Sequence, residues 1–167
     1  MKKLSVLLSI LMVLSIILTM VGCSSENPVD DTTSSTETST EEIVNLPEAL
    51  SNIVKADVPA LANTSWELSG GMIDGVEMEE EDLQNILTNF GGRMDFVFVD
   101  GEKVQLSNGE YALESTYKAS EGNVLYMDFN EYKYHAVFTD IQGNTVMIVA
   151  NETEPNSALY FLQIQEG

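Results

Sequence analysis

Residues 103–129, KVQLSNGEYALESTYKASEGNVLYMDF, are the stretch that decides the fold. Apolar and polar residues alternate in it, which is typical of strands that bury one face. Asn108-Gly109 stands between two alternating segments and predicts a tight hairpin turn. A second turn is expected at residues 121–123. The stretch therefore predicts three consecutive antiparallel strands, at 103–107, 110–118 and 124–129.

Strand patterns continue on both sides of this stretch. They predict further strands at residues 64–69, 94–99, 133–139, 145–150 and 158–165. The last seven of the eight expected strands follow one another by short turns, which is the pattern of an antiparallel meander. A meander of this length closes into a barrel or folds as a sandwich, and closure leaves no free strand edges. The prediction is a mainly β fold, an eight-stranded antiparallel up-and-down barrel over residues 63–167.

The connection between the first two expected strands, residues 70–93, is long and contains a helix. Four residues of this connection recur at helical spacing and form one apolar stripe: Leu83, Ile86, Leu87 and Phe90. The acidic residues 79–82 suit the first turn of a helix, and Gly91-Gly92 ends it. Connections of this length often have a function. The helix is expected to cover one barrel end, either as a lid over a pocket or as a plug, and the plug is the favoured interpretation.

A tryptophan on the first strand, a long first connection and a following meander together resemble the lipocalin-like barrels of bacterial lipoproteins. The resemblance covers roughly residues 61–165 and is one of architecture. It implies that a small apolar or amphipathic ligand binds inside the barrel. The aromatic candidates for lining such a pocket are Trp66, Tyr111, Tyr117, Tyr126, Tyr134 and Phe138. Aromatic residues at strand spacing more often form plain core, and this alternative stays open.

The N-terminus has the layout of a secretory signal peptide over residues 1–22. Lys2-Lys3 precedes an apolar run from residue 4 to residue 21, and Gly22 is small. The following Met20-Val21-Gly22-Cys23 segment resembles the lipobox of bacterial lipoproteins, which implies that Cys23 receives a diacylglyceryl group with palmitate-type chains. The alternative is an uncleaved anchor helix, since the apolar run reaches the lower length limit of a membrane span.

Residues 23–44 are expected to form a tether between this anchor and the barrel. The stretch is rich in Ser, Thr and acidic residues and has no aromatic residue, so it cannot bury enough surface to fold. Residues 45–62 form a lead-in with a short helix predicted over 47–56. Pro47 suits its first turn, and Pro59 forbids its continuation. Its apolar residues Leu50, Ile53 and Val54 need a surface on which to dock.

The charge and the cysteine content of the chain argue against nucleic acid binding and against an intramolecular disulfide. The chain has 27 Asp and Glu residues against 7 Lys and Arg, for a net charge of −20. No basic stripe is present, which argues against nucleic acid as a partner. The single cysteine, Cys23, rules out an intramolecular disulfide. The expected location is the extracytoplasmic face of a cell membrane, with the N-terminal lipid as the membrane contact.

The sequence shows no catalytic or metal-binding constellation. His135 is the only histidine, and the sequence places neither a nucleophile nor an orienting carboxylate beside it. A zinc site needs more nitrogen or sulfur ligands, so a packing or surface role is favoured for His135. The acidic residues 77–82 offer oxygen ligands for Ca²⁺, but helix N-terminal charge is the simpler explanation. No enzyme activity, cofactor or metal is expected.

Two hypotheses for function follow from these patterns. The first is a membrane-anchored binding module that takes a small apolar or amphipathic ligand through the barrel end beneath residues 70–93. The second is a structural or interaction protein of the cell envelope, with a filled barrel and no ligand. The two differ in whether the inward-facing side chains leave a cavity.

Overall fold

The structure, a computed structural model, describes residues 46–164. The expected signal peptide (1–22), the expected lipidation site Cys23, the whole expected tether (23–44) and residue 45 of the lead-in lie outside the described residues. Within residues 46–164, no helix is long and apolar enough to cross a membrane.

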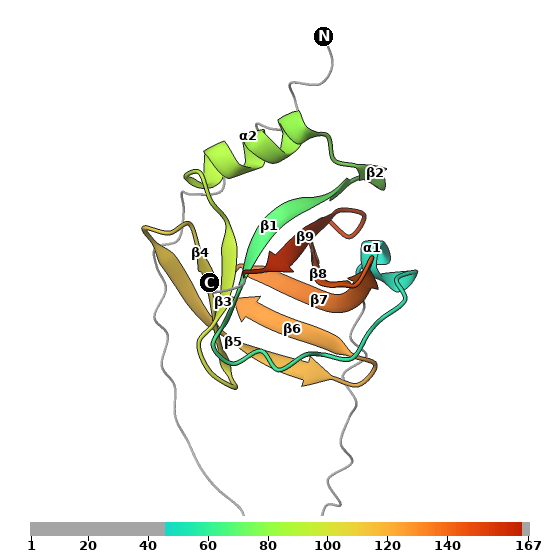
Figure 1. Ribbon diagram of the computed structural model, residues 1–167, viewed down its shortest axis with the longest axis vertical. Helices are drawn as coiled ribbons and strands as arrows, with labels where there is room; N and C mark the ends of the chain where they lie inside the picture. The colour runs from blue at the N-terminus through green and yellow to red at the C-terminus, as the bar shows by residue number, and fades with distance from the viewer. Residues whose placement is uncertain (1–45, 165–167) are drawn as a thin grey trace, which may run out of the picture. The chain divides into compact units, whose positions relative to one another are not determined.

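Eight antiparallel strands form a closed barrel, which confirms the predicted fold (Figure 1). Each strand pairs with the next along the chain, and pairing of the first with the last closes the ring. A short extra strand, β2 (Val76–Glu77), folds back on the end of the first. The barrel strands are β1 (Thr64–Ile73), β3 (Asp95–Phe98), β4 (Lys103–Ser107), β5 (Ala112–Ser120), β6 (Val124–Phe129), β7 (Tyr132–Ile141), β8 (Asn144–Asn151) and β9 (Ala158–Gln163).

Strand β1 runs four residues beyond its predicted end at residue 69. Gly70-Gly71 suggests a strand end in sequence, yet both glycines belong to β1 and pair with β9. A Cβ atom on Gly71 would lie 2.5 Å from the carbonyl oxygen of Ala158. The glycine therefore permits the close approach of the two strands that close the barrel. A register shift between Leu68 and Gly70 bends β1 at the same place.

Side chains fill the barrel interior. Trp66 meets Phe138 edge-on with ring centroids 5.4 Å apart, and Phe96 meets Phe161 in the same way at 5.0 Å. An eight-stranded barrel is just wide enough for its own side chains. The interior cluster comprises sixteen buried residues: Leu61, Trp66, Leu68, Met94, Phe96, Phe98, Val104, Leu106, Leu125, Met127, Phe129, Ala136, Phe138, Met147, Val149 and Phe161.

Two segments cover the two ends of the barrel (Figure 1). Helix α2 (Glu80–Phe90) crosses one end, and its predicted stripe of Leu83, Ile86, Leu87 and Phe90 packs against the interior cluster. The helix ends at Gly91, whose φ of 103° is the left-handed conformation expected of a glycine stop. The lead-in after residue 52 crosses the opposite end, where the Ala56 amide donates to the Phe138 carbonyl at 2.7 Å.

A second apolar cluster lies on the outer face of β6–β9. Helix α1 (Glu48–Ser51) docks there through the fully buried Leu50, so the lead-in helix does find a surface. The helix is shorter than the predicted 47–56, and Val54 is 85% exposed rather than part of its stripe. The chain leaves the helix at Asn52 because it must turn toward the barrel end. The buried members of this outer cluster are Leu50, Val124, Val137, Val146, Ile148, Ala150 and Ala158.

Candidate functional site

An open groove of about 630 Å³ lies outside the barrel, between α1, the β1–β2 turn and strands β8 and β9. Its volume falls within the range of about 300–1,000 Å³ that is usual for ligand sites. The groove has an apolar floor of Ala49, Ile53, Met72, Ile148 and Tyr160, which belong to or pack on the outer cluster. Its rim consists of Gly75 and four polar or acidic residues, Glu48, Asn52, Asp74 and Asn156.

Backbone hydrogen bonds hold the walls of the groove in place. The Ala49 amide donates to the Pro155 carbonyl at 2.8 Å, which fixes α1 to the β8–β9 loop. The Gly75 amide donates to the Asn156 carbonyl at 3.0 Å, which fixes the β1–β2 turn to the same loop. Helix α1 and the β1–β2 turn are thus both hydrogen-bonded to the β8–β9 loop. The groove between these three segments is therefore preformed.

Tyr160, one of the lining residues, carries a neutral hydroxyl group. Burial raises the pKa of Tyr160 above its ordinary value of 10.0, and the nearby Glu77 carboxylate raises this pKa further. The phenol therefore stays protonated at physiological pH and can both donate and accept a hydrogen bond.

A smaller hollow of about 180 Å³ lies between the C-terminus of α2 and the β4–β5 hairpin. Its lining residues are Asn89, Phe90, Leu106, Asn108, Tyr111, Ala112 and Leu113. Asn108 organises this hollow, because its amide nitrogen donates to the Phe90 carbonyl at 3.0 Å. Its side-chain oxygen accepts hydrogen bonds from the amides of Glu110 and Tyr111 at 3.0 and 2.8 Å. The predicted Asn108-Gly109 turn is therefore part of a wider loop, and β5 begins only at Ala112.

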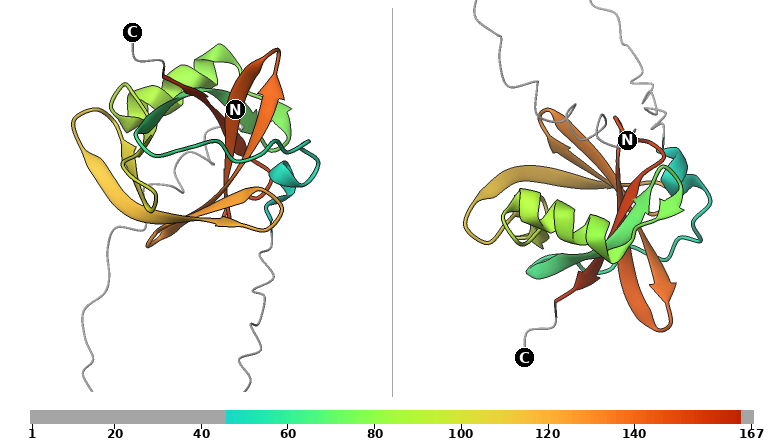
Figure 2. Two further views of the ribbon diagram at one scale, coloured as in Figure 1. Left: turned by 60° about the horizontal axis from the view of Figure 1, so that its bottom comes forward. Right: turned by 90° about the horizontal axis from the view of Figure 1, so that it is seen from above.

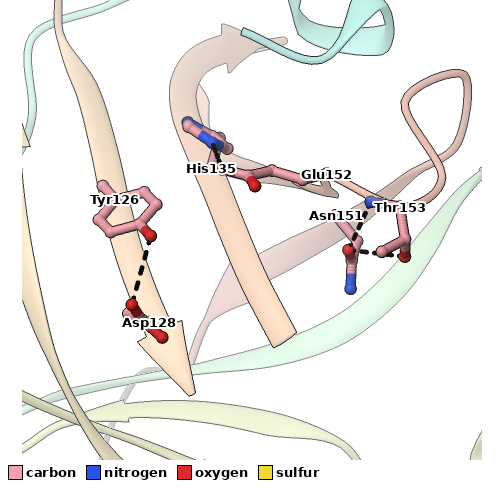
Figure 3. Close-up of polar contacts among 6 residues, drawn as sticks. All are labelled: Tyr126, Asp128, His135, Asn151, Glu152 and Thr153. Carbon is pink, nitrogen blue, oxygen red and sulfur yellow. Dashed lines mark hydrogen bonds and ion pairs between the residues drawn. The ribbon is translucent and has the colours of Figure 1, made fainter. Parts of the chain in front are cut away.

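His135 is only 1% exposed. It lies on the outer face of β7, next to Glu152 (Figure 3). Its Nε2 atom is 2.8 Å from Oε1 of Glu152, which comes from the loop after β8. Sequence reasoning missed this partner because Glu152 reaches His135 only across the β7–β8 ladder. Nδ1 is buried and has no hydrogen-bond partner among the described residues, so no nucleophile is held against the ring. The pair fixes the loop that carries Pro155 and Asn156.

Tyr126 flanks this pair without joining it in a hydrogen bond. Its ring centroid lies 5.3 Å from that of His135, and its hydroxyl donates to Asp128 at 3.4 Å (Figure 3). Burial, followed by the charge of Asp128, raises the pKa of Tyr126 above 10.0. The phenol is therefore neutral at physiological pH and is not poised as a base.

The structure brings together only part of the predicted aromatic set. Trp66, Phe138 and Tyr134 belong to the interior or pack against it. Tyr117 packs edge-on against Phe98 at 5.0 Å at the margin of the interior. Tyr111 is 77% exposed in the β4–β5 turn, and Tyr126 lies outside the barrel, so the six residues do not line one pocket.

Comparisons with known proteins find no matching family model, no matching curated protein and no matching solved structure. Within residues 46–164, no three His, Cys, Asp or Glu side chains come together as a possible metal site. The outer groove, with an apolar floor, a polar rim and fixed walls, is the candidate site that geometry favours. Its residues lie as far apart as Glu48 and Tyr160, and the only sequence signal for it was the apolar face of the lead-in helix.

Proposed function

We propose that this chain is an extracytoplasmic lipoprotein, anchored through Cys23, whose barrel is a binding module for a small amphipathic ligand. The outer groove carries the ligand part of the proposal, because it joins an apolar floor to a polar rim in a preformed volume of about 630 Å³. A closed β-barrel is compatible with a binding module. The tether of residues 23–44 then gives the groove access to molecules near the membrane surface.

The N-terminal sequence supports the anchor. The only thiol of the chain stands directly after an apolar leader, and two or more acyl chains on it hold a protein stably on a membrane. Cells that express the full chain and are fed labelled palmitate should yield a labelled product in the membrane fraction. The Cys23→Ser variant should carry no label and should keep its leader. A Cys23→Ser product with the same processed length and the same membrane retention contradicts lipidation.

The lining of the groove selects the chemistry of the ligand. Ile53, Met72 and Ile148 suit a short alkyl or ring segment. Glu48 and Asp74 are acidic, and no lining residue is basic, so a cationic or hydrogen-bond-donating head group is favoured over an anionic one. The preference is modest, because both carboxylates are exposed and screened by salt.

The filled interior supports a site outside the barrel. A ligand inside the barrel has to displace large, fully buried side chains such as Trp66 and Phe138. Extra groups forced into a packed core cost about 1–3 kcal/mol or more. The outer groove takes a ligand without this penalty.

Native mass spectrometry of the chain from residue 24 onward, with octylamine, octanol and octanoate below their micelle concentrations, tests the ligand proposal. We expect a specific octylamine adduct, a weaker octanol adduct and the weakest adduct with octanoate. Ile53→Ser should weaken octylamine binding by about tenfold, since it removes apolar contact from the floor without adding a charge. Val54→Ser is the matched control, because Val54 is 85% exposed and does not line the groove. Equal binding by the two variants contradicts the proposed site.

A further inference from the structure

The N-terminal part of β5 has a free edge. Residues 112–116 pair with β4, whereas the ladder with β6 covers only residues 116–120. The Ser115 hydroxyl donates to the Asp128 carbonyl where that ladder ends. Residues 112–115 therefore have no strand partner on the side away from β4 within the described range. Figure 2 shows the β4–β5 hairpin standing out from the rest of the barrel.

The direction of the backbone groups along this edge follows from the hydrogen bonds around it. The Tyr111 carbonyl accepts from Asn108, and the Tyr117 amide donates to the Glu102 carbonyl, so the odd-numbered residues face β4. Backbone groups alternate along a strand. The N–H and C=O groups of Ala112 and Glu114 therefore point to the free side, where an added strand can bind them.

Apolar side chains accompany this edge. Leu113 stands opposite the inward-facing Leu106, yet it is 56% exposed, because no strand covers it on the free side. It lines the smaller hollow together with Phe90 and the exposed Tyr111. Peptides that add a strand to a sheet gain affinity from backbone hydrogen bonds and specificity from pockets for alternate side chains. The free edge and the hollow together have both features.

Charge indicates which kind of strand fits. Glu114 is the only charged residue of the free segment 112–115 and lies on the opposite face of β5 from Leu113. Lys103 and Lys118 lie on the Glu114 face as well, but Lys103 stands on β4 and Lys118 in the part of β5 that β6 covers. Asp128 stands across from Thr116 at the end of the β5–β6 ladder, next to the free segment. The chain as a whole carries a net charge of −20. A second copy of this chain brings the same charge and would set its own Glu114 against this edge, which is unfavourable. An extended partner with apolar side chains on the Leu113 face and basic side chains on the Glu114 face is therefore favoured.

We propose that the free edge of β5 binds an extended polypeptide segment with alternating apolar and basic side chains. Its backbone pairs with Ala112 and Glu114. Its apolar side chains lie beside Leu113 and enter the hollow next to Phe90, and its basic side chains lie beside Glu114. This surface is separate from the outer groove and does not depend on the ligand proposed there.

Amide hydrogen exchange followed by NMR tests the proposal on the chain from residue 24 onward. The probe is an acetylated hexapeptide of alternating Lys and Val, compared with one of alternating Glu and Val. We expect the Lys–Val peptide to protect the amides of Ala112 and Glu114 and to leave those of Leu113 and Ser115 unchanged. Leu113→Lys and Glu114→Gln should each weaken binding, the former by about tenfold.

The control variant is Ile141→Lys. Ile141 lies near the tip of the β7–β8 hairpin and is 44% exposed. It does not line the hollow, and it pairs with β8 rather than with β4 or β5. It should change the affinity by less than about twofold. Equal binding of the Glu–Val peptide, protection at other strands, or equal loss with Ile141→Lys overturns the proposal. Self-association of the chain through Leu113 in sedimentation also overturns it, since the occupant is then a second copy.

Discussion

The side-chain amide of Asn108 donates a hydrogen bond to the carbonyl oxygen of Phe90 at 3.0 Å, so the β4–β5 turn holds the last turn of α2. This contact matters because no residue of α2 is fully buried. The four residues of its apolar stripe are only partly buried against the interior cluster. Asn108 therefore helps to decide whether α2 stays on the barrel end.

Replacing Asn108 with Asp should loosen α2. Asn108→Asp keeps the oxygen that accepts from Glu110 and Tyr111 but removes the donor to Phe90. It also puts a negative charge at a helix C-terminus, which the helix dipole disfavours. We expect a loss of about 1–2 kcal/mol in the free energy of unfolding. Asn144→Asp, at the exposed start of β8, is the control. Hydrogen exchange in α2 that matches the wild type contradicts this role.

Gly71→Ala should strain the closure of the barrel. The added Cβ would lie 2.5 Å from the Ala158 carbonyl oxygen, which belongs to the paired strand β9. Urea unfolding should show a loss of about 1–3 kcal/mol, as for overpacking in a core. Gly70→Ala is the neighbouring control, because a Cβ at Gly70 meets nothing within 4 Å. Equal stability of the two variants would contradict this prediction, because β1 and β9 could then move apart without a measurable cost.

Phe138→Trp tests whether the barrel is filled. Phe138 is fully buried and meets Trp66 edge-on, so a larger ring should cost about 1–3 kcal/mol in stability. Tyr126→Trp places the same ring on the outer face and should change stability by less than about 0.5 kcal/mol. Thermal and urea unfolding measure both variants. A tolerated Phe138→Trp points to unfilled space inside the barrel.

We expect the free energy of unfolding to depend on pH through Asp95. Burial raises the pKa of Asp95 above its ordinary value of 3.8, and this effect outweighs the lowering by its ion-pair partner Arg93. The folded chain then binds the proton more tightly than the unfolded chain, so the contribution of Asp95 to stability increases as pH falls through its raised pKa. As the pH falls, the free energy of unfolding of the wild type should therefore rise relative to that of Asp95→Asn, which has no carboxylate at this position. An unchanged difference between pH 7 and pH 4 contradicts this.

The sequence predicts the strands well because each depends on local alternation. The predicted bounds of β4 and β6 coincide with the structure. Elements that depend on distant contacts were less predictable. Gly71 suggests a strand end, and only the approach of Ala158 shows why β1 continues. The helix 47–56 contracts to α1 because the chain must turn to cross the barrel end.

The candidate site was harder to predict than the fold. The alternation of apolar and polar residues shows which side chains share a face of a strand. It does not show which distant segment of the chain covers that face. The outer groove exists because α1 lies against the β8–β9 loop through Ala49 and Pro155, which are over a hundred residues apart in sequence. Glu152 likewise reaches His135 only when β7 and β8 pair. Neither contact leaves a periodic signal in the sequence.

Methyl NMR of the chain from residue 24 onward, titrated with octylamine, tests the central claim most directly. The account predicts saturable shifts at the methyl groups of Ile53, Met72 and Ile148, which line the outer groove. The methyl groups of Leu125, Met127 and Met147, which face the filled interior, should not shift. Shifts at these interior methyl groups with an unchanged outer groove would contradict it, because the ligand would then lie inside the barrel.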